Sequence, residues 1–129
     1  MGQLHQEVSF EDEVCTVLAA QGWLYQVGDA QAYDRARALF PPDLIAWVQE
    51  TQPKAWEALQ KAHGANAEAT LLDRVRKSLD DRGTLDVIRN GVELIGLRAP
   101  VQLAQFKPAI GMNPELVMRY QANRLRVVR

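Results

Sequence analysis

Proline and glycine divide the middle of the chain into short segments, and this punctuation limits the regular elements that can form. Pro41-Pro42, Pro53, Gly64 and Gly83 stand at the ends of stretches with helical periodicity. Proline lacks a backbone donor and glycine tolerates positive φ, so such residues start or stop helices. We therefore expect several short capped helices, in a chain of 129 residues that corresponds to about one domain.

Apolar residues recur at helical spacing between these breaks. Helices are predicted from Ser9 to Gly22 and over residues 30–40, 44–52, 53–63, 66–82 and 114–122. The clearest pattern follows Asn66, where Leu71, Leu72, Val75 and Leu79 form one apolar stripe. These segments predict a mainly α fold.

Short β-prone runs accompany the helices. Residues 101–106 and 125–129 are expected to be short strands, and residues 23–27, which are aromatic and β-branched between two glycines, either a short strand or an extended link. Residues 84–96 carry two signals: Asn90-Gly91 is typical of a hairpin turn, whereas Thr84 before Leu85 and Ile88 predicts a capped helix. Both alternatives stay open, and the predicted class is mainly α with a few short β-strands (α+β).

The charge is nearly balanced overall but uneven along the chain. Fifteen basic and 16 acidic residues give a net charge of -1, so no overall cationic field attracts nucleic acid or anionic lipid. Residues 1–34 hold six acids and no Lys or Arg, a net of -6, and residues 35–129 hold fifteen bases against ten acids, a net of +5. No run approaches the roughly 20 apolar residues of a membrane helix. The single Cys15 and the absence of a signal-peptide pattern favour a cytoplasmic protein.

A search for catalytic chemistry finds no complete site. His5 and His63 are far from zinc-ligand spacing, and His63 is expected to end a helix, where a cation suits the dipole. No phosphate-binding glycine loop and no Glu-x-Lys or Asp-x-Lys tripeptide occurs. The cluster Glu11-Asp12-Glu13 has two readings, a solvated first helical turn or an accessory carboxylate for a metal site.

The last part of the chain is basic. Arg119, Arg124, Arg126 and Arg129 against Glu115 alone give residues 113–129 a net charge of +3. The planar fork of arginine suits phosphate contacts, which makes these four residues the DNA-binding candidates. The alternative is an ordinary solvated face.

A succession of short strings runs along residues 10–129. They are Phe10-Glu11, Gly22-Trp23, Tyr33-Asp34, ALFPPDL at 38–44, TQPKAW at 51–56, RGTLDVIRNG at 82–91, QFKPA at 105–109, Asn113-Pro114-Glu115 and YQANRL at 120–125. Their order and separations resemble the opening of the R (restriction and motor) subunit of type I restriction enzymes. Because nearly the whole chain takes part, the succession is more specific than any one string.

The resemblance implies a long bacterial cytoplasmic subunit that cleaves DNA. Such a subunit joins a Mg-dependent nuclease domain of restriction-endonuclease-like α/β fold to an ATP-driven translocase, and works with modification and specificity subunits. The family's catalytic Asp and Glu-x-Lys follow the run at 125–129. We thus expect residues 1–8 to be a flexible tail and 9–129 a single domain, the N-terminal portion of a nuclease domain truncated before its catalytic motif.

The same resemblance bears on cofactors and site residues. Some nucleases of this class place a glutamate from the first helix near the metal, which makes Glu11 the catalytic and metal-site candidate in this chain. Mg and ATP are implied for the parent protein, with neither bound by this fragment. The fragment is expected to be inactive and mostly monomeric. The competing hypothesis is a non-catalytic helical module that docks on the modification subunit.

Overall fold

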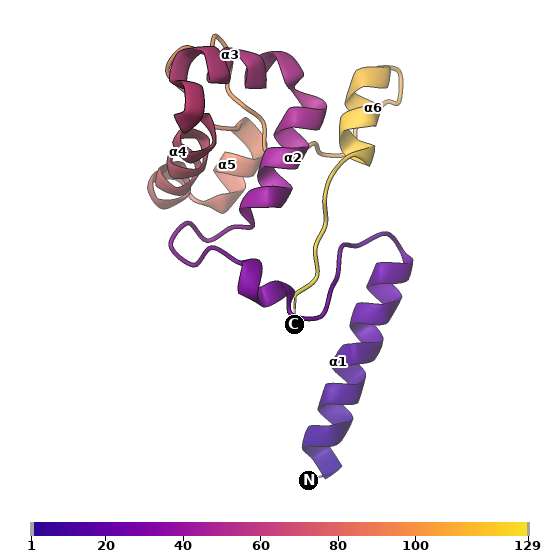
Figure 1. Cartoon of the computed structure of the whole chain (residues 1–129). Helices are drawn as coiled ribbons and strands as arrows, with labels where there is room; N and C mark the ends of the chain where they lie inside the picture. Colours follow the sequence, from indigo (N-terminus) through magenta and orange to yellow (C-terminus); the bar gives the residue numbers. More distant parts are fainter. Residues whose placement is uncertain (1, 129) are drawn as a thin grey trace. The chain divides into compact units, whose positions relative to one another are not determined.

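A computed structural model describes the backbone of residues 2–128 and the side chains of residues 6–128. Helix accounts for 61% of the chain and strand for 5%, so the prediction of a mainly α fold is confirmed. The helices are α1 (Gly2–Ala20), α2 (Pro41–Thr51), α3 (Pro53–His63), α4 (Ala67–Arg82), α5 (Thr84–Asn90) and α6 (Pro114–Gln121), with 3-10 turns η1 (Asp29–Ala32) and η2 (Gly64–Asn66) (Figure 1). Among the described residues, β-structure is limited to isolated bridges.

The backbone groups into two compact units. One combines Met1–Tyr33 with Arg124–Arg129, and the other is Asp34–Asn123. The sequence-based division into a tail at 1–8 and one domain at 9–129 stays a prediction. Each unit is described by itself below.

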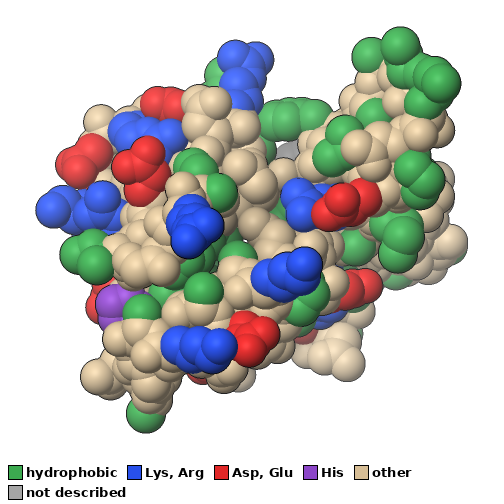
Figure 2. All heavy atoms as spheres, turned by 90° about the horizontal axis from the view of Figure 1, so that it is seen from above, with side chains coloured by type: hydrophobic (Ala, Val, Ile, Leu, Met, Phe, Trp, Pro, Cys, Tyr) green, Lys and Arg blue, Asp and Glu red, His purple; other side chains and the backbone are tan. Residues whose placement is uncertain are grey.

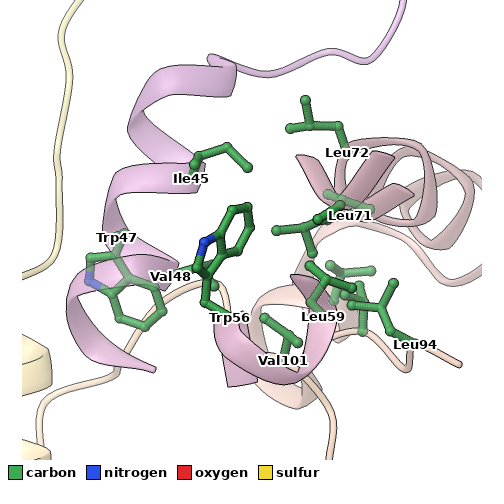
Figure 3. Close-up of a cluster of buried hydrophobic side chains, with 13 residues drawn as sticks. Ile45, Trp47, Val48, Trp56, Leu59, Leu71, Leu72, Leu94 and Val101 are labelled. Atoms are coloured by element: carbon green, nitrogen blue, oxygen red, sulfur yellow. The ribbon is translucent and has the colours of Figure 1, made fainter. Parts of the chain in front are cut away.

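Helices α2 to α5 enclose the core of the larger unit. Apolar side chains from these helices and from the loop after α5 form one buried cluster (Figure 3). Its largest fully buried members are Leu59, Leu71, Val48, Val75, Val87, Val92 and Val101. The apolar stripe predicted after Asn66 lies in this cluster: Leu71, Leu72 and Val75 are buried, and Leu79 packs against them. Burial of this apolar surface is the main favourable contribution to folding of the unit.

The helix starts follow the proline and asparagine signals. Pro41 and Pro53 occupy first-turn positions of α2 and α3, where no intrahelical N–H bond is lost. The Asn113 side chain accepts bonds from the N–H groups of Glu115 and Leu116 at 3.0 and 3.4 Å and so caps α6. The starts of α3 and α6 agree with the sequence-based expectation. Helix α2 begins at Pro41 instead of residue 44, so Pro41-Pro42 starts a helix where the end of one was predicted.

Residues 84–96 contain both a helix and a bridged segment. Helix α5 ends at Asn90, and Gly91 follows with φ 73° and ψ -167°. Val92 then pairs antiparallel with Val101, with N–O distances of 2.9 and 2.8 Å in the two directions. The helical alternative is therefore correct for 84–90, and Asn90-Gly91 is a helix end instead of a hairpin turn.

The predicted strand at 101–106 is wrong beyond Val101, because side-chain amides replace a neighbouring strand. The Gln52 side chain accepts from Gln102 N at 2.8 Å and donates to Gln102 O at 2.9 Å. The Asn123 side chain likewise accepts from Gln105 N at 3.0 Å and donates to Gln105 O at 2.7 Å. We call these two pairs the amide clamps. They hold an extended segment that has no sheet around it.

The helix predicted over 30–40 is also wrong. A 3-10 turn ends at Ala32, and Asp34 forms an antiparallel bridge with Leu39 around Ala38, whose φ is +60°. The Asp34 carboxylate accepts from Arg37 N at 3.1 Å. This bond, with the Arg37 guanidinium, lowers the pKa of Asp34. An aspartate side chain that bonds a nearby backbone N–H favours a loop over a helix. Here this bond outweighs the helix propensity of the neighbouring alanines.

In the smaller unit, helix α1 begins at Gly2 instead of Ser9. Leu24 forms a single parallel bridge with Arg126, through Leu24 N to Leu125 O at 2.7 Å and Val127 N to Leu24 O at 3.1 Å. The expected strands at 23–27 and 125–129 are thus reduced to this bridge within the described residues. Through this bridge, the N–H of Val127 in the second run is bonded to Leu24 O.

An ion pair joins α4 to α5. Arg82 Nη2 lies 3.2 Å from Asp86 Oδ1, and Arg82 Nη1 donates to Gly91 O at 3.1 Å beyond the end of α5. Asp86 also accepts from Asn90. These bonds lower the pKa of Asp86, the bond from Arg82 most strongly.

We expect Arg82→Gln to raise the pKa of Asp86 toward the ordinary aspartate value of about 3.9. In the native protein the lowered pKa of Asp86 stabilises the folded state at pH values above the ordinary aspartate pKa. This contribution is lost as the pH falls through the folded pKa. Carboxyl-carbon NMR titration measures the shift. Arg76→Gln is the matched control, because Arg76 pairs with Asp80 and leaves Asp86 untouched. An Asp86 titration unchanged by Arg82→Gln would contradict the assignment.

No helix within the described residues is both long enough and apolar enough to cross a membrane.

Candidate nucleic-acid interface

Arg119 lies in the larger unit, on α6. Its Nη2 is 3.0 Å from Glu115 Oε1, one helical turn earlier. Its Nε is buried and has no hydrogen-bond partner. The guanidinium is therefore bonded to its own helix through Nη2, and its Nε donor has no acceptor.

The other arginine candidates belong to the smaller unit. Arg126 forms an ion pair with Asp29 at 2.5 Å, and the two side chains are 21% and 10% exposed. Asp29 also accepts from Gln26 N at 2.8 Å, so this carboxylate ties the 24–29 segment to the end of the chain. Arg124 is exposed, and Arg129 lies outside the described residues. The structure thus gives Arg126 a structural role that the sequence did not indicate.

The basic residues predicted to act as one run are divided between the two units, Arg119 in one and Arg124 and Arg126 in the other. On the face shown in Figure 2, basic and acidic side chains are interspersed. Their assignment as DNA-binding residues stays a prediction.

Glu11 is exposed on α1. Neither Glu11 nor any other described residue belongs to a group of three or more His, Cys, Asp or Glu side chains placed to hold a metal ion. Cys15, on the same helix, is buried. The role of Glu11 at a metal site stays a prediction.

A cavity of about 780 Å³ lies in the larger unit and was not indicated by the sequence. Lys54 of α3, Arg98 of the loop before Val101, and Arg119 of α6 line it, together with one acid, Glu115. Lys54 and Arg98 are exposed. The sequence did not predict this cluster because the three cations are far apart along the chain, and only the tertiary fold brings them to one cavity.

A second cavity, of about 570 Å³, lies between α3, α4 and the loop after α5. His63 ends α3 as predicted, and its Nε2 lies 3.2 Å from Ile95 O at this cavity. Arg74 Nε donates to Glu93 O at 3.0 Å. Acidic and basic groups alternate in its lining, so this cavity has no single charge preference.

Comparison with known proteins gives no match: no family model, no curated protein and no solved structure is similar to this chain.

Proposed function

We propose that the chain is the N-terminal part of a type I restriction enzyme R subunit, in which it serves as scaffold and DNA contact for a restriction-endonuclease-like nuclease domain. The ordered succession of strings along residues 10–129 carries this proposal. The parent is a type I site-specific deoxyribonuclease, which hydrolyses phosphodiesters with Mg and moves along DNA with ATP. Its partners are DNA and the modification and specificity subunits, in a bacterial cytoplasm.

The chain itself supplies no complete catalytic set under this proposal. A Mg-dependent nuclease needs carboxylates to hold the metal and a lysine to stabilise charge or place the attacking water. No Glu-x-Lys occurs in the sequence, and Glu11 is the single first-helix carboxylate that the resemblance assigns to the metal. The mainly helical fold suits a scaffold role, with Arg119, Arg124, Arg126 and Arg129 as the proposed DNA contacts.

One observation favours a second candidate, a helical module that docks on the modification subunit. Phe10, Val14 and Val17 recur along one face of α1 and are 65%, 38% and 49% exposed. An apolar helical stripe that stays exposed is typical of a surface that a partner covers.

Salt-dependent binding to a labelled duplex distinguishes the two candidates. A DNA contact predicts a log affinity that falls with log salt, at a slope of about 0.9 per phosphate contacted. Fluorescence anisotropy of the full chain with a 20-base-pair duplex, from low to physiological salt, measures this slope. Absent or salt-independent binding would favour the docking module.

Incubation with Mg and supercoiled DNA tests the assignment of catalysis to residues outside this chain. We expect no cleavage. Mg-dependent cuts that Glu11→Ala abolishes would overturn it.

A further inference from the structure

Three cationic side chains from different parts of the larger unit converge on the cavity of about 780 Å³. Lys54 comes from the first turn of α3, Arg98 from the loop between α5 and α6, and Arg119 from the last turn of α6. Within residues 2–128, no ion pair joins Lys54 or Arg98 to an acid. Glu115 is the one acid of the lining and is bonded to Arg119. The lining therefore carries three positive charges against one negative charge.

Arg119, one of the residues that line the cavity, has an unsatisfied donor. Its Nη2 is bonded to Glu115, whereas its Nε is buried without an acceptor. A buried N–H without a partner keeps its full desolvation penalty, so an acceptor bound beside it would be stabilised. The guanidinium fork fits two oxygens of a tetrahedral anion particularly well.

The remainder of the lining is uncharged. Its apolar residues are Pro53, Ala55, Ala58, Leu97, Ala99 and Pro100, and Thr51, Gln52, Gly96 and Gln102 complete it. The occupant that matches this combination has a tetrahedral anion beside a flat or aliphatic surface, as in the phosphate and sugar of a nucleotide unit. The positive end of the α3 dipole lies at the same cavity and adds to the attraction for an anion.

We propose that this cavity, with Lys54, Arg98 and Arg119 as its ligating residues, is a binding site for a backbone phosphate of DNA. The inference deepens the DNA contact proposed above, and rests on it for the source of the phosphate. It adds two residues, Lys54 and Arg98, to the predicted contact residue Arg119. Phosphate contacts of this kind position DNA without reading its sequence.

Paired charge-removing variants of the full chain test the site. Lys54→Gln with Arg98→Gln removes two cavity cations, and Lys107→Gln with Arg89→Gln removes the same charges from exposed positions outside the cavity lining. We expect the cavity variant to bind a labelled duplex about tenfold more weakly near 0.1 M salt and to lose about 0.9 from the salt slope, the value for one phosphate contact. The control variant should change the affinity by less than about twofold, since a charge that contacts no phosphate is largely screened at this salt concentration.

Equal losses in the two double variants would overturn the phosphate site and leave the proposed DNA contact intact. If the unmodified chain binds no duplex, the proposed DNA contact is wrong. Titration with inorganic phosphate, followed by amide NMR, then tests whether the cavity binds an anion. Shifts confined to residues around Lys54, Arg98 and Arg119 would then support the anion site but overturn DNA as its source. The absence of such shifts would overturn both. Circular dichroism of each variant confirms that the helices are retained.

Discussion

Gly91→Ala is expected to lower the free energy of unfolding by roughly 3 kcal/mol, from backbone strain and overpacking together. The φ of 73° and ψ of -167° at Gly91 lie in a region that is open essentially to glycine alone. A Cβ at this position would also stand 2.4 Å from Val101 O, a backbone atom that accepts the bond from Val92. Relief of the clash requires the Val92–Val101 bridge to move, and both valines are fully buried.

Gly83→Ala is the matched control for this effect. Gly83 has φ 84° and ψ 162°, close to the backbone conformation of Gly91, but a Cβ there meets nothing within 4 Å. Urea denaturation of both variants separates the backbone strain, which they share, from the clash, which only Gly91→Ala has. Equal destabilisation of the two variants would show that the contact with Val101 costs nothing.

Gln52→Ala should cost about 2–6 kcal/mol of stability, because it leaves two partly buried backbone groups of Gln102 unsatisfied at about 1–3 kcal/mol each. Gln52 is 8% exposed, and its side chain bonds both the N–H and the C=O of Gln102. Gln60→Ala removes the same side chain from an exposed position of α3 and should stay within about 0.5 kcal/mol of the unmodified chain. Chemical denaturation of both variants at neutral pH measures the difference.

Gln52→Glu tests the contact with Gln102 O in a second way. The new carboxylate would face Gln102 O, which needs a donor, so burial and repulsion should raise its pKa above the ordinary glutamate value of about 4.3. The destabilisation is then full above the raised folded pKa and declines as pH falls through it, because the protonated acid can donate. A variant whose stability relative to the unmodified chain is the same at pH 4 and pH 7 would rule out this contact.

The helices α3 and α4 could be predicted from the sequence because their start signals, apolar stripes and glycine ends all agree. The segment 30–40 could not, because its alanines favour helix weakly and the Asp34 carboxylate captures Arg37 N instead. The strand expected at 101–106 failed for a different reason. The backbone of this segment is bonded to the side chains of Gln52 and Asn123. No local sequence pattern indicates that side-chain amides from distant positions will take the place of a neighbouring strand.

The candidate interface shows the same division between local and tertiary information. Arg119 was identified because it belongs to a basic run, but its buried Nε depends on packing. Lys54 and Arg98 had no local signal, since each is a single cation among uncharged neighbours. Arg126 was chosen for its charge, and only the fold shows that Asp29 holds it.

The amide clamps also protect the molecule against self-association. An extended segment with free N–H and C=O groups is a template on which another chain can add a strand, which is a common origin of aggregation. At Gln102 and Gln105 those groups are already bonded to Gln52 and Asn123 of the same chain. A side-chain amide presents an N–H donor and a C=O acceptor side by side, as a strand does to its neighbour, but it cannot extend the ladder to a further strand. The clamps therefore terminate β-pairing at the positions where they satisfy it.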